Sequence, residues 1–469
     1  MEIESISVPN VPAGAVNERG VITVPVNRRE SSGQNLRLEF YRFRKLPSAA
    51  PATPPIFVLQ GGPGYEGLDE SIDHPEFYAT AVERYARIAD VVIIGQRGFG
   101  TSGATPCPGL AVKSLAEVDT LAEREERERT MAEGCRDAFR EEDRDMSGFN
   151  IVEMAEDVWD VARALGYSQI QLKGNSFGSF WAMAVARRHP ESIARLTLAS
   201  LEGPDHTFDL ASEVRQSLTH LASSAAESKR YRDRIPPEGL LDAYQAVIDR
   251  ADQAPLAGTF RDDKTGEMLT VPIDGDALRY LTLGVRRPPK FRYLATDWPD
   301  DLLRIIEGDL SFAAQRLGRR WMNPNSDHAA ETLVECSSGA SRERRRAIAE
   351  DPHRRLFPRP PLLTNGVCEV WDDEVTPMET SSFRSSIPAV LVQGTWDIST
   401  PYANAKEVRA IFSDHHFITV DGGSHGAIHE AEEASEDLQK QLDHWYATGQ
   451  RAQLPTEVLL PPMRWSGEQ

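Results

Sequence analysis

The sequence Gly-Asn-Ser-Phe-Gly at positions 174–178 constrains the fold of this chain more than any other segment. Residues 169–173 before it alternate in polarity and predict a short strand, and residues 180–188 after it are mostly apolar and predict a helix. A serine between two glycines, at a sharp turn from strand to helix, projects its hydroxyl from the edge of a sheet. We therefore predict that Ser176 is a nucleophile. The residues expected to support its turn are Gly174, Asn175 and Gly178.

Two more predicted strands each end in a loop that presents one titratable side chain. Strand 389–393 leads to Asp397, and strand 417–420 leads to His425 in a glycine-rich loop. The carboxyl ends of parallel strands meet at the same edge of a sheet. Serine, aspartate and histidine in this chain order form a triad in which the histidine takes the serine proton and the aspartate orients the histidine. We predict those roles for Ser176, His425 and Asp397.

Simpler interpretations exist for single members of this set. Asp397 alone is also typical of a turn before Thr-Pro, and His425 alone is also typical of a loop. His425 and His429 are four residues apart, but they lack the glutamate of the H-E-x-x-H zinc motif. The Gly-Phe-Gly sequence at 98–100 lacks the lysine of a phosphate-binding loop. The expectation is therefore no metal, no cofactor and no nucleotide.

An earlier glycine-rich loop predicts an oxyanion hole. A predicted strand at 55–60 ends at Gln60 and is followed by Gly-Gly-Pro-Gly at 61–64. A tetrahedral intermediate needs at least two N–H donors aimed at its oxygen. We expect the donors to be the backbone N–H groups of Phe177 and Gly62, with Gly61 as the next candidate. The residues expected to support this loop are Gln60 and Arg97. The alternative is a plain Gly-Pro turn.

Three segments together resemble a known family. They are residues 60–64, the sequence Gly-Gln-Arg-Gly-Phe-Gly-Thr-Ser-Gly at 95–103, and residues 174–178. They resemble the motifs of proline iminopeptidases and, more closely, those of the tripeptidyl aminopeptidase branch of α/β-hydrolases. The resemblance implies an α/β-hydrolase fold, with a mostly parallel sheet, helices on both faces and a large, mainly helical cap inserted before the Asp/His segment. It also implies hydrolysis of a carboxylic amide or ester through an acyl-enzyme.

Departures from the family pattern keep the substrate open. The family's usual histidine before Gly-Gly-Pro-Gly is Gln60 here, its usual aspartate before Gln-Arg-Gly is Gly95, and its Trp-x-x-Trp-Glu amine-anchoring motif is not found. We therefore lean slightly to an ester or lactone of a bulky small molecule. The alternatives are an exo-aminopeptidase that releases N-terminal residues and, less favoured, a binding protein without catalysis. Four acids are not singled out by their spacing, and we expect most of them to lie on solvated helix faces: Glu202, Asp205, Asp209 and Glu213.

Composition and pattern predict the organisation of the chain. We expect a first core part at 1–202, a cap at 203–386 and a second core part at 387–469, with cap helices at 211–227 and 237–252. Residues 21–26 and 36–43 predict an opening hairpin, residues 1–20 an irregular arm, and residues 430–447 one closing helix. Trp321 and Met322 are candidates for the pocket lining, although a buried cap core is the favoured explanation.

Charge and cysteine content limit the partners. The net charge of −20, from 72 acidic and 52 basic residues, argues against nucleic acid and anionic membranes. The expected partner is a small molecule or short peptide, and the choice between monomer and homo-oligomer is open. The N-terminus lacks a signal-peptide pattern, so we expect a cytoplasmic protein unless a leader was removed. The four cysteines also follow the family's pattern, which makes Cys107–Cys135 and Cys336–Cys368 conceivable bridges, but three pairings stay open.

Overall fold

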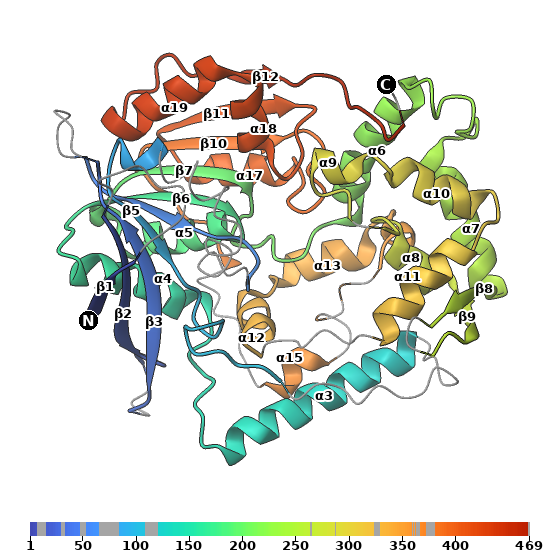
Figure 1. Ribbon diagram of the computed structural model, residues 1–469, viewed down its shortest axis with the longest axis horizontal. Helices are drawn as coiled ribbons and strands as arrows, with labels where there is room; N and C mark the ends of the chain where they lie inside the picture. The colour runs from blue at the N-terminus through green and yellow to red at the C-terminus, as the bar shows by residue number, and fades with distance from the viewer. Residues whose placement is uncertain are drawn as a thin grey trace.

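A ten-stranded sheet forms one side of the computed structural model (Figure 1). The structure describes residues 1–6, 16–29, 33–46, 53–64, 84–107, 121–262, 265–286, 288–322, 329–358, 360, 362, 366–371 and 380–467. The strands lie in the order β1-β2-β3-β5-β4-β6-β7-β10-β11-β12. Their bounds are β1 Glu2–Ser5, β2 Asn17–Pro25, β3 Asn35–Phe43, β4 Ile56–Leu59, β5 Val91–Ile94, β6 Ile170–Ser176, β7 Ile193–Leu201, β10 Ala389–Gly394, β11 His415–Asp421 and β12 Glu457–Leu459.

The sheet is parallel from β5 to β12 and antiparallel at its other end. Strands β5, β4, β6, β7, β10, β11 and β12 run parallel, whereas β1, β2 and β3 are antiparallel to their neighbours. This confirms the mostly parallel sheet and the opening hairpin. The prediction of an irregular arm was wrong for residues 2–5 and 17–20, which form strands, while residues 7–15 lie outside the described part. Residues of β1 are all exposed, so no apolar alternation marks it as a strand.

Helices cover both faces of the sheet, as predicted. One face packs against α4 (Ile151–Ala164), α5 (Phe177–Arg188) and α17 (Asn404–Ile411), and the other against α18 (Ala427–Ala434) and α19 (Glu436–Thr448). The single closing helix expected at 430–447 is two helices. Ser435 interrupts it because its backbone is extended and its hydroxyl accepts the Leu438 N–H, which caps a new helix.

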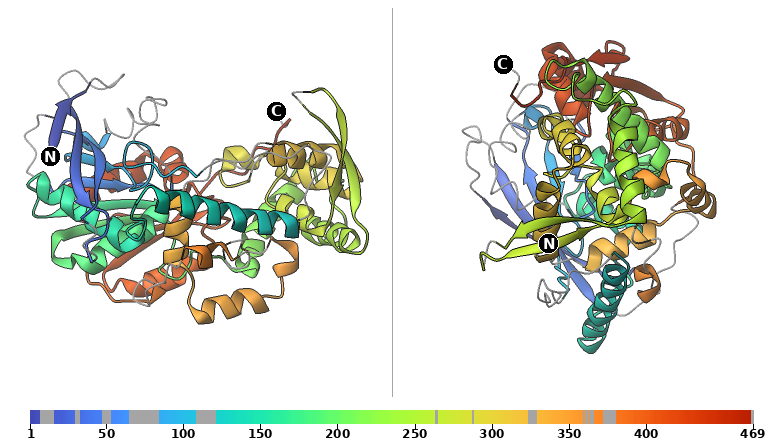
Figure 2. Two further views of the ribbon diagram at one scale, coloured as in Figure 1. Left: turned by 90° about the horizontal axis from the view of Figure 1, so that it is seen from below. Right: turned by 90° about the vertical axis from the view of Figure 1, so that its right-hand side faces the viewer.

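Much of the chain between β7 and β10 lies beside the sheet (Figure 2), and many of its apolar side chains form a second buried cluster. The first helix of this segment, α6, has the predicted bounds. The second predicted helix begins three residues later than expected, as α7. A two-stranded hairpin, β8–β9, interrupts the helical series. The bounds are α6 Ala211–Glu227, α7 Leu240–Gln253, β8 Leu256–Arg261, β9 Met268–Ile273, α8 Gly275–Leu281, α9 Arg292–Ala295, α10 Trp298–Ile306, α11 Ser311–Met322, α12 Ala329–Ser338, α13 Arg342–Glu350 and α15 Val367–Val370.

The second cluster also includes residues from outside this insertion. Trp396 and Ile398, which flank Asp397, pack in it, and so does Trp465 near the C-terminus. Trp465 meets the Tyr231 ring edge to face at 5.6 Å between ring centres. The chain therefore returns to the second cluster after the last strand of the sheet. No helix in the described part of the chain is long and apolar enough to span a membrane.

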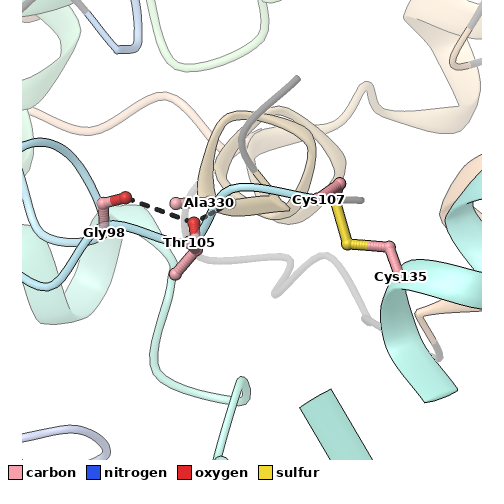
Figure 3. The surroundings of a disulfide bond; sticks show 5 residues. All are labelled: Gly98, Thr105, Cys107, Cys135 and Ala330. Atoms are coloured by element: carbon pink, nitrogen blue, oxygen red, sulfur yellow. Dashed lines mark hydrogen bonds between the residues drawn. A yellow bond between two sulfur atoms is a disulfide. The ribbon is translucent and has the colours of Figure 1, made fainter. Parts of the chain in front are cut away.

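Two disulfides link segments that are distant in the sequence. Cys107 is bonded to Cys135 of α3 (Leu121–Glu141), and Cys336 of α12 is bonded to Cys368 of α15. Near the first bridge, Thr105 accepts the Ala330 N–H and donates to the Gly98 carbonyl, so α12 is docked on the loop after β5 (Figure 3). Disulfides persist mainly in oxidising environments and are rare in the cytosol. The two bridges therefore do not support a cytoplasmic location, which stays a prediction.

Candidate active site

Ser176 occupies a strained turn between β6 and α5. Its backbone has φ 59° and ψ −134°, a conformation with positive φ that side-chain-bearing residues rarely adopt. Strain of this kind persists only where the surrounding structure enforces it, and it is concentrated at functional sites. The Ser179 hydroxyl donates to the Ser176 carbonyl at 2.7 Å and so holds the turn from the helix side.

The two glycines of the pentapeptide are required by close backbone contacts. A Cβ atom on Gly178 would lie 2.1 Å from the Leu59 carbonyl oxygen of β4. A Cβ atom on Gly174 would lie 2.2 Å from the Gly178 carbonyl oxygen. Neither position can accept a side chain without moving backbone. Helix α5 therefore starts directly against the sheet, and Ser176 is forced into the turn. Asn175 pairs with Ala199 of β7, and its side-chain oxygen is buried without a hydrogen-bond partner.

Asp397 and His425 form a buried pair. The Nδ1 atom of His425 lies 2.9 Å from each carboxylate oxygen of Asp397, which is fully buried. The backbone N–H groups of Ser399 and Thr400 donate to the same carboxylate at 2.9 and 3.0 Å. Burial by itself raises the pKa of Asp397, but the charge and hydrogen bond of His425, together with these N–H groups, lower it below its usual value. An ionised Asp397 facing Nδ1 leaves Nε2 free to accept a proton.

The cap region holds the backbone of both residues in this pair. The Ser217 hydroxyl of α6 donates to the Asp397 carbonyl at 2.7 Å, and the His425 N–H donates to the Lys290 carbonyl at 3.0 Å. These bonds fix the two loops from the side opposite the sheet. The pair is thus built jointly by the strand ends and by the chain inserted between them.

Strand β7 connects the histidine loop to the serine. Ser176 pairs with Leu201, and the adjacent Ser200 donates its hydroxyl to the His425 carbonyl at 2.6 Å. Ser200 also has positive φ, 47°. No hydrogen bond joins the Ser176 hydroxyl to His425 in the described structure. Catalytic hydrogen bonds are often long before substrate binds, so this geometry is compatible with the proposed triad. No sequence motif pointed to Ser200, because its contact joins residues 225 positions apart.

The loop at 61–64 lies against Ser176. A Cβ atom on Gly61 would be 3.2 Å from the Cβ and 3.6 Å from the hydroxyl oxygen of Ser176. The buried Gln96 side chain fixes this loop, donating to the Gly61 and Gln60 carbonyls at 2.8 and 3.3 Å and accepting the Gly64 N–H at 2.8 Å. Gln96 stood within the quoted motif, but sequence gave no reason to single it out.

The two other candidates for the oxyanion hole are Gly62 and Phe177. Gly62 is in the same loop with φ 112°, a conformation that favours glycine. Phe177 is the first residue of α5, so its N–H has no partner within the helix. Gly62 and Phe177 therefore stay predicted oxyanion-hole donors, one in the loop beside Ser176 and one at the start of α5.

Arg97 belongs to the scaffold that carries the loop after β5. Its guanidinium is almost fully buried and makes two hydrogen bonds to Asp157 of α4, at 2.8 and 2.7 Å. It also donates to the Val26 and Gly148 carbonyls. Arg97 thus ties the segment after β2 to α4.

Three partly buried acids, named here the sheltered acids, interact through their charges: Glu202, Asp209 and Glu335. Glu202 comes directly after β7, and its N–H donates to the Ser179 hydroxyl at 2.9 Å. Burial, and then the negative charges of Asp209 and Glu335, raise the pKa of Glu202 well above its usual value. Burial likewise raises the pKa of Asp209 to about 8 and that of Glu335 to about 7. Each of the three side chains is only partly exposed.

The structure corrects the expectation that the four acids noted in the sequence lie on solvated helix faces. Of the four acids noted in the sequence, Asp205 accepts hydrogen bonds from Ser341 and Glu213 pairs with Arg344, so both are structural. Glu202 and Asp209 belong to the sheltered group. The sequence could not single them out because Glu335, which completes the group, is 133 positions after Glu202. The side chains of Trp321 and Met322 lie outside the described part.

The described residues contain no group of three or more histidines, cysteines or acids arranged to hold a metal ion.

Comparison with known proteins places the chain among hydrolases. The model of the family described as "alpha/beta hydrolase fold" matches residues 54–227, and that described as "TAP-like protein" matches residues 359–454. Tripeptidyl aminopeptidases of Streptomyces lividans and Streptomyces coelicolor are each 24% identical, covering 87% of this chain and 78% and 77% of their own. A solved esterase from Thermogutta terrifontis is 14% identical, covers 91% of this chain and 99% of its own, and has a TM-score of 0.35. So low a score supports no functional argument.

The raised pKa of Glu335 predicts a pH-dependent stability. The folded protein keeps a proton on Glu335 that the unfolded chain releases, so the free energy of unfolding falls as pH rises from about 4.5 to about 7. In Glu335→Gln this loss between pH 5 and pH 8 should be smaller by about 2 kcal/mol, allowing for partial exposure. Urea unfolding at both pH values measures it. The matched control is Glu350→Gln, an exposed acid of α13, and an identical loss in Glu335→Gln would contradict the prediction.

Proposed function

We propose that this chain, a serine hydrolase with an α/β-hydrolase fold that is similar to tripeptidyl aminopeptidases, cleaves a carboxylic acyl bond through Ser176, His425 and Asp397. The observation that carries this proposal is the positive φ of Ser176 at the turn from β6 into α5. The Asp397–His425 pair, which lies at the ends of neighbouring strands β10 and β11, supports it.

The proposed reaction has two stages. His425 takes the proton of the Ser176 hydroxyl through Nε2 as the oxygen attacks the carbonyl carbon. The N–H groups of Phe177 and Gly62 stabilise the resulting oxyanion, and Asp397 stabilises the imidazolium. His425 then gives the proton to the leaving amine or alcohol as the acyl bond breaks. Water, deprotonated by His425, releases the acid and restores Ser176.

The sheltered acids favour a substrate with a free ammonium group. Glu202 has neighbours of its own sign, Asp209 and Glu335, which disfavour its ionised form. A bound cation would compensate this repulsion, whereas a neutral ligand would not. Glu202 follows the strand that pairs with Ser176. We therefore propose an exo-aminopeptidase in which Glu202 holds the N-terminal ammonium group, as the similarity to tripeptidyl aminopeptidases also supports.

An ester or lactone hydrolase is the second candidate. The absence of the Trp-x-x-Trp-Glu motif favours it, because that motif supplies the amine anchor in proline iminopeptidases. The same triad cleaves both bond types, and an amide differs mainly in requiring a proton on its leaving nitrogen. A bulky neutral ester would also place no charge near the three acids. Sequence alone leaned slightly to this candidate, and the acid group moves the balance to the aminopeptidase.

Ser176→Ala should abolish turnover of every substrate. We expect a loss on the order of 10⁶-fold in kcat, the scale of a triad serine, with an unchanged circular dichroism spectrum. The assay compares wild type and variant on tripeptidyl arylamides with free and acetylated N-termini and on aryl esters and lactones. Activity of Ser176→Ala near that of wild type would contradict the triad. Wild-type turnover confined to esters and lactones would select the second candidate.

Glu202→Gln should weaken catalysis selectively on substrates with a free amine. Loss of one partner of a sheltered charge pair should reduce kcat/KM for the free-amine arylamide at least tenfold. The ratio of kcat/KM for free and acetylated substrates is the diagnostic measurement, and Glu350→Gln, exposed on α13, is the matched control. An unchanged ratio in Glu202→Gln would remove Glu202 from the amine site.

A further inference from the structure

A short stretch of the cap region, residues 290–293, is fastened to the loop that carries His425. The Lys290 carbonyl accepts the His425 N–H at 3.0 Å. The Arg292 guanidinium donates to the Gly422 carbonyl at the start of this loop and to the Pro461 carbonyl of the C-terminal segment. Hydrogen bonds therefore join this stretch to the histidine loop at two places, at Gly422 and at His425.

Glu430 of α18 joins the same two segments. Its carboxylate accepts the Arg292 N–H at 3.3 Å and the Ser424 N–H at 2.8 Å, and it also accepts the Ser424 hydroxyl. Ser424 is adjacent to His425. A side chain carried between Lys290 and Arg292 thus keeps a fixed position relative to the imidazole.

That side chain is Phe291, which lies beside the His425 ring. The two ring centres are 5.9 Å apart with an interplanar angle of 49°. Tyr293 stacks on Phe291 with ring centres 5.7 Å apart and nearly parallel planes, at 7°. Phe291 is half-buried, whereas Tyr293 is 72% exposed. An aromatic series therefore leads from His425 to the surface and ends in an exposed ring.

We propose that Phe291 and Tyr293 form the subsite for the leaving group of the substrate and favour an aromatic one. The histidine of a serine hydrolase protonates the leaving atom, which must come within about 3 Å of the imidazole. The substituent on that atom must therefore extend past the surroundings of His425. Aromatic rings attract one another at centre separations of 4.5–7 Å, so a ring in this substituent can continue the series. The inference rests on the proposed function, because it concerns the leaving group of the same reaction.

The test uses pairs of substrates that share an acyl group and differ only in the leaving group. One pair is a peptide that releases phenylalaninamide or glycinamide, and the other is the benzyl or ethyl ester of one acid. We expect wild type to favour the aromatic member by about five- to tenfold in kcat/KM. Tyr293→Ala should lower this ratio at least threefold, and adding Phe291→Leu should bring it close to one. Because Tyr293 is exposed, its loss should leave the fold intact.

The control is Leu459→Ala, which removes an equally exposed apolar side chain from β12 and should leave the ratio unchanged. A wild-type ratio near one, or the same ratio in Tyr293→Ala, would overturn the subsite. If neither pair shows turnover that depends on Ser176, the proposed function fails instead. In that case, calorimetry of amide binding tests the subsite. Wild type should bind phenylalaninamide at least fivefold more tightly than glycinamide, and Tyr293→Ala should not show this preference. Equal binding of the two amides by wild type would overturn it.

Discussion

The close contact between α5 and the sheet is the constraint on which the rest of the site depends. Gly178 lies against the Leu59 carbonyl, and Gly174 lies against the Gly178 carbonyl, at distances that exclude any side chain. Between these two glycines the chain turns from β6 into α5 through Ser176, which has positive φ. The strain is sustained by the buried strands and helix on either side of the turn. The same contact brings the start of α5 and the loop after β4 together, which is where an oxyanion would be held.

The acid–base half of the site depends on a second body of structure. Asp397 stands between Trp396 and Ile398, both of which pack in the apolar cluster of the cap region, and its carbonyl accepts the Ser217 hydroxyl. His425 is held from the same side through Lys290. The insertion between β7 and β10 is therefore part of the support of the proposed triad as well as a cover beside it. If the proposed triad is correct, substitutions in this insertion that move the Asp397 or His425 loop should change the rate of proton transfer.

Local patterns predicted much of this structure, and contacts between distant residues account for what they missed. The turn at Ser176, the loops of Asp397 and His425, and α6 were predictable because glycine placement and apolar spacing are local signals. The two-helix end of the chain was missed because the cap formed by Ser435 competes with a continuous helical pattern. Gln96 and Ser200 bond, and Glu335 interacts electrostatically with, residues far along the chain, so no spacing rule marks them. The slight lean to an ester rested on the missing Trp-x-x-Trp-Glu motif, because the sequence pattern did not group Glu202 with Asp209 and Glu335.

The central claim is that Ser176 is an activated nucleophile, and covalent labelling tests it most directly. The native protein is treated with a fluorophosphonate, digested, and mapped by mass spectrometry, with the rate of labelling compared in Asp397→Asn. The account predicts a single adduct on Ser176, formed in wild type at least 100-fold faster than in the variant, because Asp397 holds His425 in the tautomer that accepts the serine proton. An adduct on another serine, or no adduct on Ser176 while the protein remains folded, would contradict it.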